Sequence, residues 1–376
     1  MDAEAALLAA IAIDPEDPMP YRVYGDWLLM RDDPRGELIA LQATGDEHPG
    51  DHRISDAAAA HIRANRATYL GALQALWSPE RETDLRLAWR CGFIGAAELE
   101  LWVPEDGKPD PADALAALLE LPSARFLTRL VIEPGLVRDG MELVAATLAA
   151  HAPLPLRRLH LGAVDLWSPL RAAELGALGA IWPAVPQLTH LVIAGRPRSL
   201  GLIDLPNLRE ASIQLDPGSG ARAARVLHDV ATARWPTLET LRIWHGHDPG
   251  AIAAVLARAD LVTLGDVALI NCGFADLACA VIAASPLAPQ LHRLSLARGT
   301  LTDAGCRTLL RERAAFPSLA TIDVSQTFVT DDGRAMLREL AREVVAHDRR
   351  RGARDVAIPA PPSRDDDDDD DAYDEA

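Results

Sequence analysis

The cysteines, which could act as nucleophiles or bind metals, are few and scattered in this chain. Cys91, Cys272, Cys279 and Cys306 form no Cys-x-x-Cys pair, and no histidine cluster accompanies them. A structural zinc site needs four such ligands, usually in closely spaced pairs. No phosphate-binding glycine loop, nucleophile elbow or zinc-protease motif occurs either. We therefore expect no metal, no cofactor and no enzymatic activity.

The residues that are regularly placed are leucines. Leu291, Leu294 and Leu296 are spaced three and then two residues apart, and an amphipathic run, Leu301–Leu310, follows them. The same spacing, with Ile, Val or Ala at some positions, starts at Leu127, Leu156, Leu188, Leu208, Leu238, Leu264, Leu291 and Leu319. The starts are 29, 32, 20, 30, 26, 27 and 28 residues apart. This period is typical of leucine-rich repeats, in which a strand is followed by a turn and a helix.

A second recurrence supports the same register. Proline precedes the strand leucine by two residues in five repeats, and it cannot continue a helix. It therefore marks the turn from helix to strand. An aromatic residue often stands before it and is expected to pack between repeats. The prolines are Pro186, Pro206, Pro236, Pro289 and Pro317, and the aromatic residues are Trp182, Trp235 and Phe316. The unit 188–207 is too short for a full helix, so we expect extended or 3₁₀ structure there.

The run LTDAGCRTLL at Leu301–Leu310 resembles the signature of the ribonuclease-inhibitor class of leucine-rich repeats, and a weaker copy starts at Val329. The resemblance implies an α/β solenoid with a parallel concave β-sheet and a mostly helical convex face. It also implies structural, buried roles for Cys272 and Cys306.

Side chains alternate along a strand, so the residues between the leucines should face the concave surface. Trp244 is prominent there beside Arg242, because Trp and Arg often dominate binding energy. The alternative is that Trp244 packs against a neighbouring strand or loop. The residues expected to bind a partner are Arg129, Glu133, Arg158, His160, His190, Glu210, Gln214, Arg242, Trp244, Asp266, Arg293, Ser295 and Asp323.

Other polar groups are weaker candidates. His160 and His190 are expected on adjacent strands but at different positions, and no third metal ligand stands near them. The turn His245–Asp248 holds two histidines and an aspartate. The run Gly218–Gly220 could bind an anion at a helix N-terminus or simply form a turn.

The N-terminal part predicts helices. They are expected at residues 2–13, from Pro20, from Pro34 with Asp33 as N-cap, and at residues 55–76, with Ile62, Tyr69, Leu70 and Leu73 buried. Residues 7–42 resemble the repeat-companion domain, a bacterial module of myxobacterial and planctomycete proteins. The matching positions include Asp14-Pro15, Tyr24, Asp26-Trp27-Leu28 and Asp33-Pro34-Arg35-Gly36-Glu37. Asp26, Arg35 and Glu37 could form a site, but an ion-pair network that holds three helices together is the favoured interpretation.

Residues 85–103 alternate like strands and should cap the apolar end of the solenoid. We expect a helical module at 1–80, a strand and helix cap at 81–125, about eight repeats at 126–346, and a disordered tail at 347–376. The tail contains seven consecutive aspartates. It could be inert or compete for the concave arginines.

The net charge is −18, and −8 of it lies in residues 364–376, which leaves −10 for the rest. This acidity argues against nucleic acid and anionic membranes, which need clustered positive charge. No apolar run is long enough to span a bilayer, and the N-terminus lacks the positive region of a signal peptide. We expect a cytoplasmic monomer.

The leading hypothesis is a non-enzymatic scaffold that binds a protein with a basic patch on its concave face. The alternative is a regulator, either an enzyme inhibitor or a GTPase-activating protein that uses Arg298 or Asn271 at a repeat turn.

Overall fold

The chain divides into two compact units. Unit 1 runs from Met1 to Glu133, and unit 2 begins at Pro134. The computed structural model describes residues 3–77, 84–103, 109–134, 140–162, 174–216, 220–244 and 249–348. The hypotheses about the aspartate tail, the turn His245–Asp248 and residues 218–219 fall outside these ranges.

Unit 1 begins with helices. They are α1 (Ala3–Ile13), α2 (Pro18–Leu29), α3 (Pro34–Glu47), α4 (His52–Ala64), α5 (Arg66–Leu70) and the 3₁₀ helix η1 (Gly71–Ala75). The predicted start of α3 is confirmed, because the Asp33 side chain accepts a hydrogen bond from the backbone N of Arg35 at 2.9 Å. Helix α2 starts at Pro18 rather than Pro20. Asp17 caps it by accepting from the backbone N of Met19 at 2.9 Å, as aspartate does at N-caps.

The single helix expected at 55–76 is wrong. Helix α4 ends at Ala64, and the Asn65 side chain donates to the carbonyl of His61 at 2.9 Å. Such a local side-chain bond competes with continued helix, so the chain turns and restarts at Arg66. The predicted burial is nevertheless correct for all four side chains: Ile62, Tyr69, Leu70 and Leu73.

The rest of unit 1 contains three strands. They are β1 (Leu85–Arg90), β2 (Phe93–Glu100) and β3 (Arg129–Glu133), with α6 (Pro111–Glu120) and η2 (Pro122–Ala124) before β3. Strands β1 and β2 are antiparallel, and β3 runs parallel to β2. The hairpin turns at Cys91 and Gly92, and Gly92 has φ +78°, a conformation that favours glycine.

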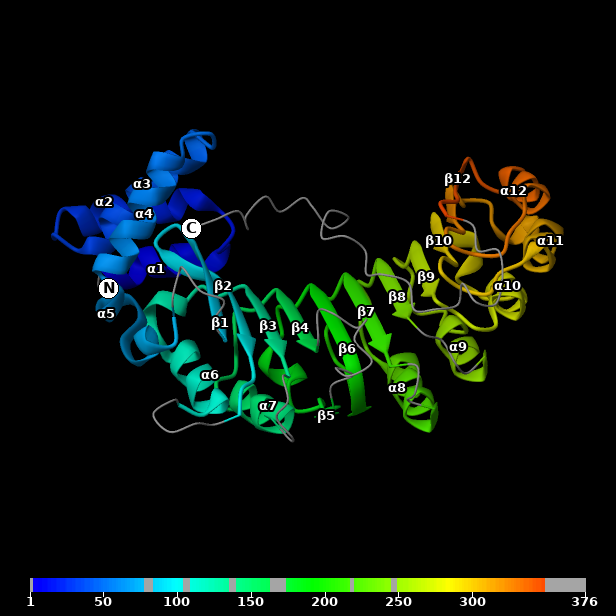
Figure 1. The fold of residues 1–376 in the computed structure, drawn as a ribbon, viewed down its shortest axis with the longest axis horizontal. Helices are drawn as coiled ribbons and strands as arrows, with labels where there is room; N and C mark the ends of the chain where they lie inside the picture. Colours follow the sequence, from blue (N-terminus) through cyan, green and yellow to red (C-terminus); the bar gives the residue numbers. More distant parts are fainter. Residues whose placement is uncertain are drawn as a thin grey trace. The chain divides into compact units, whose positions relative to one another are not determined.

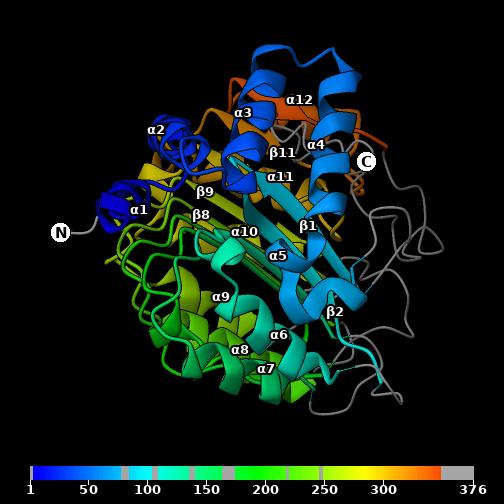
Figure 2. The same ribbon diagram turned by 90° about the vertical axis from the view of Figure 1, so that its left-hand side faces the viewer.

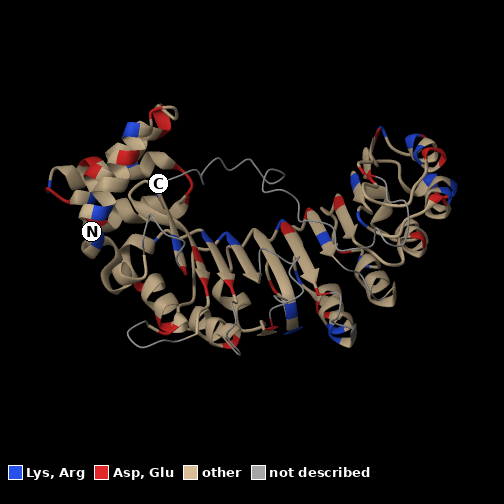
Figure 3. Cartoon of the chain, in the orientation of Figure 1, with Lys and Arg blue, Asp and Glu red and all other residues tan. Residues whose placement is uncertain are grey.

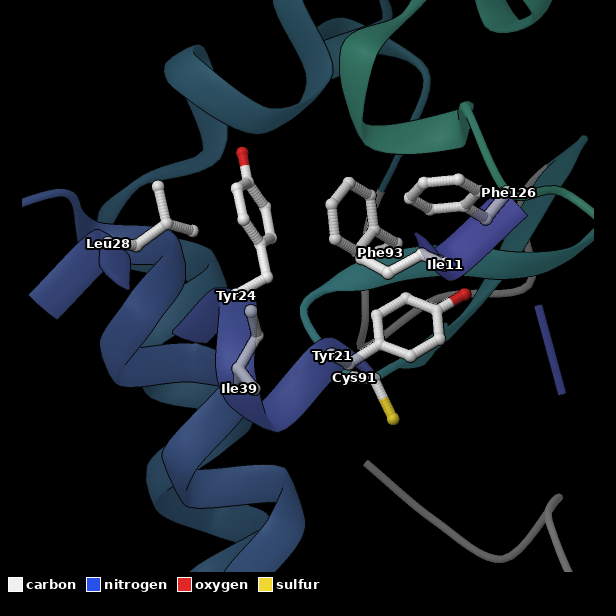
Figure 4. Packing of buried hydrophobic residues seen from close by; sticks show 8 residues of the cluster. All are labelled: Ile11, Tyr21, Tyr24, Leu28, Ile39, Cys91, Phe93 and Phe126. Carbon is white, nitrogen blue, oxygen red and sulfur yellow. The ribbon is translucent and has the colours of Figure 1, made fainter. Parts of the chain in front are cut away.

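One core joins the helices of unit 1 to this hairpin. Figure 4 shows Tyr21 and Tyr24 of α2 beside Phe93 of β2, with Phe126 next to Phe93. The Phe93 and Phe126 rings are 4.9 Å apart in a T-shaped arrangement, which aromatic pairs favour. Residues on both sides of the expected boundary at 80 and 81 thus share a core.

Unit 2 is a parallel sheet, and helices connect most of its successive strands along the chain (Figures 1 and 2). Its strand order is β4-β6-β7-β8-β9-β10-β11-β12, and β5 pairs with β6. The strands are β4 (Arg158–Gly162), β5 (Glu174–Ala177), β6 (His190–Ser199), β7 (Glu210–Leu215), β8 (Thr240–Trp244), β9 (Asp266–Ile270), β10 (Arg293–Ser295), β11 (Thr321–Asp323) and β12 (Glu343–Val345). The helices are α7 (Gly140–Ala150), η3 (Trp182–Ala184), α8 (Gly220–Thr232), α9 (Pro249–Leu256), α10 (Ala275–Ala283), η4 (Ala288–Gln290), α11 (Asp303–Arg311), η5 (Arg313–Ala315) and α12 (Asp331–Arg338).

The aliphatic residues of the repeat occupy matching positions in neighbouring strands. Leu191 pairs in register with Leu159 and Ala211, and Leu294 pairs with Val267 and Ile322. All of these side chains are buried. Strand β7 alternates between partly exposed and buried residues along its whole length. The predicted strand periodicity and the leucine-rich-repeat solenoid are therefore confirmed.

The short repeat also has the expected extended structure. Strand β6 continues to Ser199, and no helix separates it from β7. Trp182, Trp235 and Phe316 are buried, as their positions predicted. The indole nitrogen of Trp182 donates to the carbonyl oxygen of Leu200 at 2.7 Å and so bonds to the following repeat.

The residue between proline and leucine has a role that the sequence did not suggest. Thr237 Oγ1 donates to the carbonyl oxygens of Pro206 and Leu208 at 2.9 and 3.0 Å. Gln290 Nε2 does the same for Leu261 and Leu264 at 2.6 and 2.9 Å. These bonds tie each turn to the turn of the preceding repeat.

Aspartates link the last three helices of unit 2. Asp276 of α10 accepts hydrogen bonds from the backbone N and Oγ1 of Thr302, at 2.8 and 2.6 Å. Asp303 of α11 repeats both bonds, with the same distances, to Thr330. Each threonine is the N-cap of the next helix. Asp331, the equivalent residue of α12, has a side chain that is 95% exposed.

Candidate functional site

Strand register arranges the predicted binding residues of unit 2 in three rows on the sheet face that lies opposite the leucine core. We call this surface the open face. The first row is Arg158, His190, Glu210, Thr240, Asp266, Arg293 and Thr321. The second is His160, Val192, Ser212, Arg242, Ala268, Ser295 and Asp323, and the third includes Gln214, Trp244 and Ile270. His160 and His190 fall in different rows, as expected.

Charges of both signs occur on the open face (Figure 3). His190 Nε2 lies 3.4 Å from Glu210 Oε1 on the next strand. Arg293 is exposed and pairs in register with Asp266, which is partly buried. Burial raises the pKa of the Asp266 carboxyl, and the nearby Arg242 and Arg293 guanidiniums oppose that shift. Opposite charges on adjacent strands are stabilising neighbours, so this row can hold its own geometry.

Trp244 lies in its predicted row, but the residue is only 9% exposed. The Arg298 guanidinium carbon lies over the ring, 5.6 Å from its centre. Arg298 lies in the turn after β10 and has φ +62°. Trp244 therefore packs against neighbouring residues, the alternative considered from the sequence. Its buried indole nitrogen has no hydrogen-bond partner within the described part of the chain.

Two other predicted residues are engaged with each other. Ser295 is buried, and its hydroxyl donates to Asp323 Oδ2 at 3.2 Å. The other oxygen of Asp323 accepts from the backbone N of Ser325 at 2.9 Å. These groups hold the end of β10 and β11 in place. Arg158 and Arg293 of the first row are exposed, in contrast to this pair.

Arg129 and Glu133 lie in unit 1, at the two ends of β3. Glu133 pairs in register with Glu100, and Glu98 lies on the same strand as Glu100. Arg86 of β1 forms an ion pair with Glu98. Burial raises the pKa of Glu133 to about 7, with further contributions from Glu98 and Glu100. Glu98 and Glu100 were not predicted, although they alternate with the buried Ala97 and Leu99.

The expected network around Asp26, Arg35 and Glu37 forms only in part: Glu37 Oε2 of α3 lies 3.6 Å from His61 Nδ1 of α4, whereas Arg35 has other partners. Arg35 Nη1 donates to the carbonyl oxygen of Gly92 at 2.6 Å, and its Nη2 donates to Ser123 Oγ at 3.0 Å. Its guanidinium also lies 4.5 Å from the centre of the Phe93 ring. Arg35 therefore fastens α3 to the hairpin and to η2, and its guanidinium carbon also lies 5.2 Å from the centre of the Tyr69 ring in α5. Sequence spacing gave no signal of partners so distant along the chain.

The cysteines are structural, as predicted for Cys272 and Cys306. All four are buried and unpaired. Burial raises the pKa of Cys272 to about 11 and that of Cys306 to about 12. A thiol that stays protonated is a poor nucleophile and a poor metal ligand. No group of three potential metal ligands occurs among the residues that the structure describes.

Comparison with known proteins supports the fold alone. The sequence matches no family model, and no curated protein matches it. A crystal structure from Bacteroides fragilis aligns with a TM-score of 0.52 and 16% identity over 78% of this chain and 82% of that protein. An internalin from Listeria monocytogenes aligns with a TM-score of 0.27 and 11% identity over 70% of this chain and 84% of that one. In the described ranges, no helix is both long and apolar enough to cross a bilayer. Unit 2 folds as a leucine-rich-repeat solenoid, and unit 1 consists of helices and three strands.

Proposed function

We propose that this chain is a non-enzymatic scaffold that binds a protein partner on the open face of unit 2. The observation that carries the proposal is the set of three rows, which present different polar side chains at a regular spacing. Rows of this kind suit recognition of a shaped protein surface, because each strand contributes separate contacts. Thr189 Oγ1 lies 2.8 Å from His190 Nδ1, but this hydroxyl donates to the carbonyl oxygen of Arg157 at 2.9 Å, so we assign it to the turn between strands rather than to a reaction.

The partner class follows from charge. The chain carries −18 overall, so a partner with a basic patch would be steered toward it, and salt would weaken that steering. We further propose that the chain acts as a cytoplasmic monomer. We also propose that residues 7–42 belong to the repeat-companion type, on the strength of the residues that resemble it.

The regulatory alternative receives less support. A GTPase-activating role would require Arg298 or Asn271 to enter another protein's active site. Both residues hold a left-handed turn after a strand, with φ +62° and +53°. Arg298 is also placed over Trp244. Withdrawing it would uncover that ring, so we favour the scaffold.

A matched pair of variants tests the proposal. Arg293→Glu reverses an exposed charge in the first row, whereas Arg307→Glu reverses an exposed charge on α11. Quantitative affinity capture at low and high salt should recover proteins that are retained by Arg307→Glu and lost by Arg293→Glu. Capture that is equal for both variants would contradict binding at the open face. If Trp244→Ala also leaves capture unchanged while the fold survives, the third row has no part in binding.

A further inference from the structure

Helix α1 has an outward surface without polar side chains. Its eleven residues, AEAALLAAIAI, include a single charged residue, Glu4. Only Ile11 is buried, while Ile13 is 84% exposed and the alanines are exposed. Surface helices normally carry polar residues on the outward face, and a helix that is apolar all round is normally buried. Helix α1 therefore has the composition of a covered helix, but the described residues do not cover its outward side.

Helix α2 extends this surface. It packs beside α1 (Figure 2), and its buried residues Tyr21, Tyr24 and Leu28 all point to one side. Met19, Val23 and Met30, spaced four and seven residues apart, lie on the opposite side and are exposed. We call these three residues, Ile13 and the exposed alanines of α1 the α1–α2 apolar face. Methionine is common on binding surfaces because its side chain adapts to different partners.

The charges around this face are acidic. Seven carboxylates and two arginines lie between Ala3 and Asp33, a net charge of −5. Arg22 is paired with Glu47 at 2.7 Å, and the Arg31 guanidinium lies 3.7 Å from the centre of the Trp27 ring. Both arginines are thus engaged within unit 1. The outward charge comes from residues such as Asp14, Glu16 and Asp26, which are exposed.

Charge decides between the possible occupants. A lipid surface would require arginines and lysines around the apolar residues. A second copy would bring one acidic border against another, and like charges that face each other are unfavourable. A partner whose apolar surface is bordered by lysine or arginine can cover the apolar residues and also pair with the carboxylates around them. Alanines on α1 also allow the backbone of a partner helix to approach closely.

We propose that the α1–α2 apolar face binds an amphipathic helix of another protein, whose apolar side is bordered by lysine or arginine. This is a second binding surface, separate from the open face of unit 2. Helix recognition of this kind inserts apolar residues at helical spacing against a preformed apolar surface.

Two synthetic helices test the proposal with the full chain. Both have the same leucine and alanine side, one with lysine and arginine borders and the other with glutamate borders. Titration calorimetry should detect binding of the basic peptide alone, and high salt should weaken it. Ile13→Lys and Val23→Lys should each reduce its affinity about tenfold, or about 1.4 kcal/mol. The matched control is Leu202→Lys, at an apolar residue of unit 2 that is 80% exposed, and it should leave the affinity unchanged.

Several results would overturn the proposal. These are no binding of the basic peptide, equal binding of both peptides, or equal losses in Ile13→Lys and Leu202→Lys. Self-association of the wild type that Ile13→Lys abolishes would assign the face to a second copy. Binding to neutral lipid vesicles that depends on Ile13 would assign it to a membrane. Arg293→Glu should not affect the peptide, so failure of the open-face proposal would be seen separately.

Discussion

The two units of this chain are stabilised in different ways. Unit 1 depends on contacts that occur once, namely the aromatic core around Phe93 and the bonds of Arg35 to Gly92 and Ser123. Unit 2 repeats the same contacts from strand to strand, including the Asp276 and Asp303 bonds to the next helix. In a repeat array each unit is supported mainly by its neighbours. A single substitution should therefore affect all of unit 1 but only adjacent repeats of unit 2.

The largest effect is expected at the centre of the aromatic core. Phe93→Ala should lower the stability of unit 1 by about 4 kcal/mol, because it removes a buried ring and leaves a cavity. Hydrogen exchange should show lost protection in α1–α3 and in the β1–β2 hairpin. Leu294→Ala, at a fully buried residue of unit 2, should instead expose β9–β11. Loss of protection throughout the chain in both variants would show that the units are not independent.

Arg35→Ala should cost about 3 kcal/mol in unit 1. It removes charged donors from Gly92 and Ser123, and buried acceptors that lose such partners are expensive. The control is Arg22→Ala, which breaks the exposed pair with Glu47 and should cost no more than about 1 kcal/mol. Urea denaturation followed by circular dichroism measures both. Equal costs would mean that Arg35 contributes only a surface interaction.

The capping bonds between repeats can be tested at equivalent positions. Asp303→Ala removes two bonds to Thr330 and should destabilise the last repeats by about 2 kcal/mol. Asp331→Ala occupies the same place in α12, where the side chain is exposed, and should change stability by less than about 0.5 kcal/mol. Thermal melts of the two variants give the comparison. Similar shifts of the melting temperature in the two variants would show that the bonds from Asp303 to Thr330 add nothing beyond the usual effect of an aspartate at a helix end.

The smallest effect concerns pH and unit 1. The folded pKa of Glu133 is about 7, above the ordinary value of 4.5, so the folded state binds more protons between these values. The free energy of unfolding should therefore fall as pH rises from about 4.5 to about 7. Glu133→Gln removes this loss and should stabilise the protein at pH 8 by on the order of 1 kcal/mol, because the group is half buried. Glu47→Gln is the exposed control and should leave the pH dependence as it is.

Local rules predicted much of the fold. The leucine spacing identified eight strands and their buried side, and Asp33-Pro34 identified the start of α3. The boundary at Asn65 was missed, because a side chain that can end a helix is also tolerated within one. The start of α2 was missed because Asp17 and Pro20 both offer plausible helix starts.

The candidate site was predicted less well than the fold. The rows on the open face follow from strand alternation and were predicted with their members. The environment of Trp244 could not be predicted, because the Arg298 side chain that lies over it comes from a turn 54 residues further along the chain. The acidic group around Glu133 required β2 to lie beside β3 in a particular register.

The sequence by itself determined which side chains of each repeat are buried, because a strand alternates with a period of two and the leucines mark one side. It also determined that residues 2–13 form a helix that is rich in apolar residues. Tertiary structure decided which side of α1 is buried, where Arg35 donates its hydrogen bonds, and how much of Trp244 is exposed. These outcomes depend on contacts between residues far apart in the chain, which no local spacing encodes.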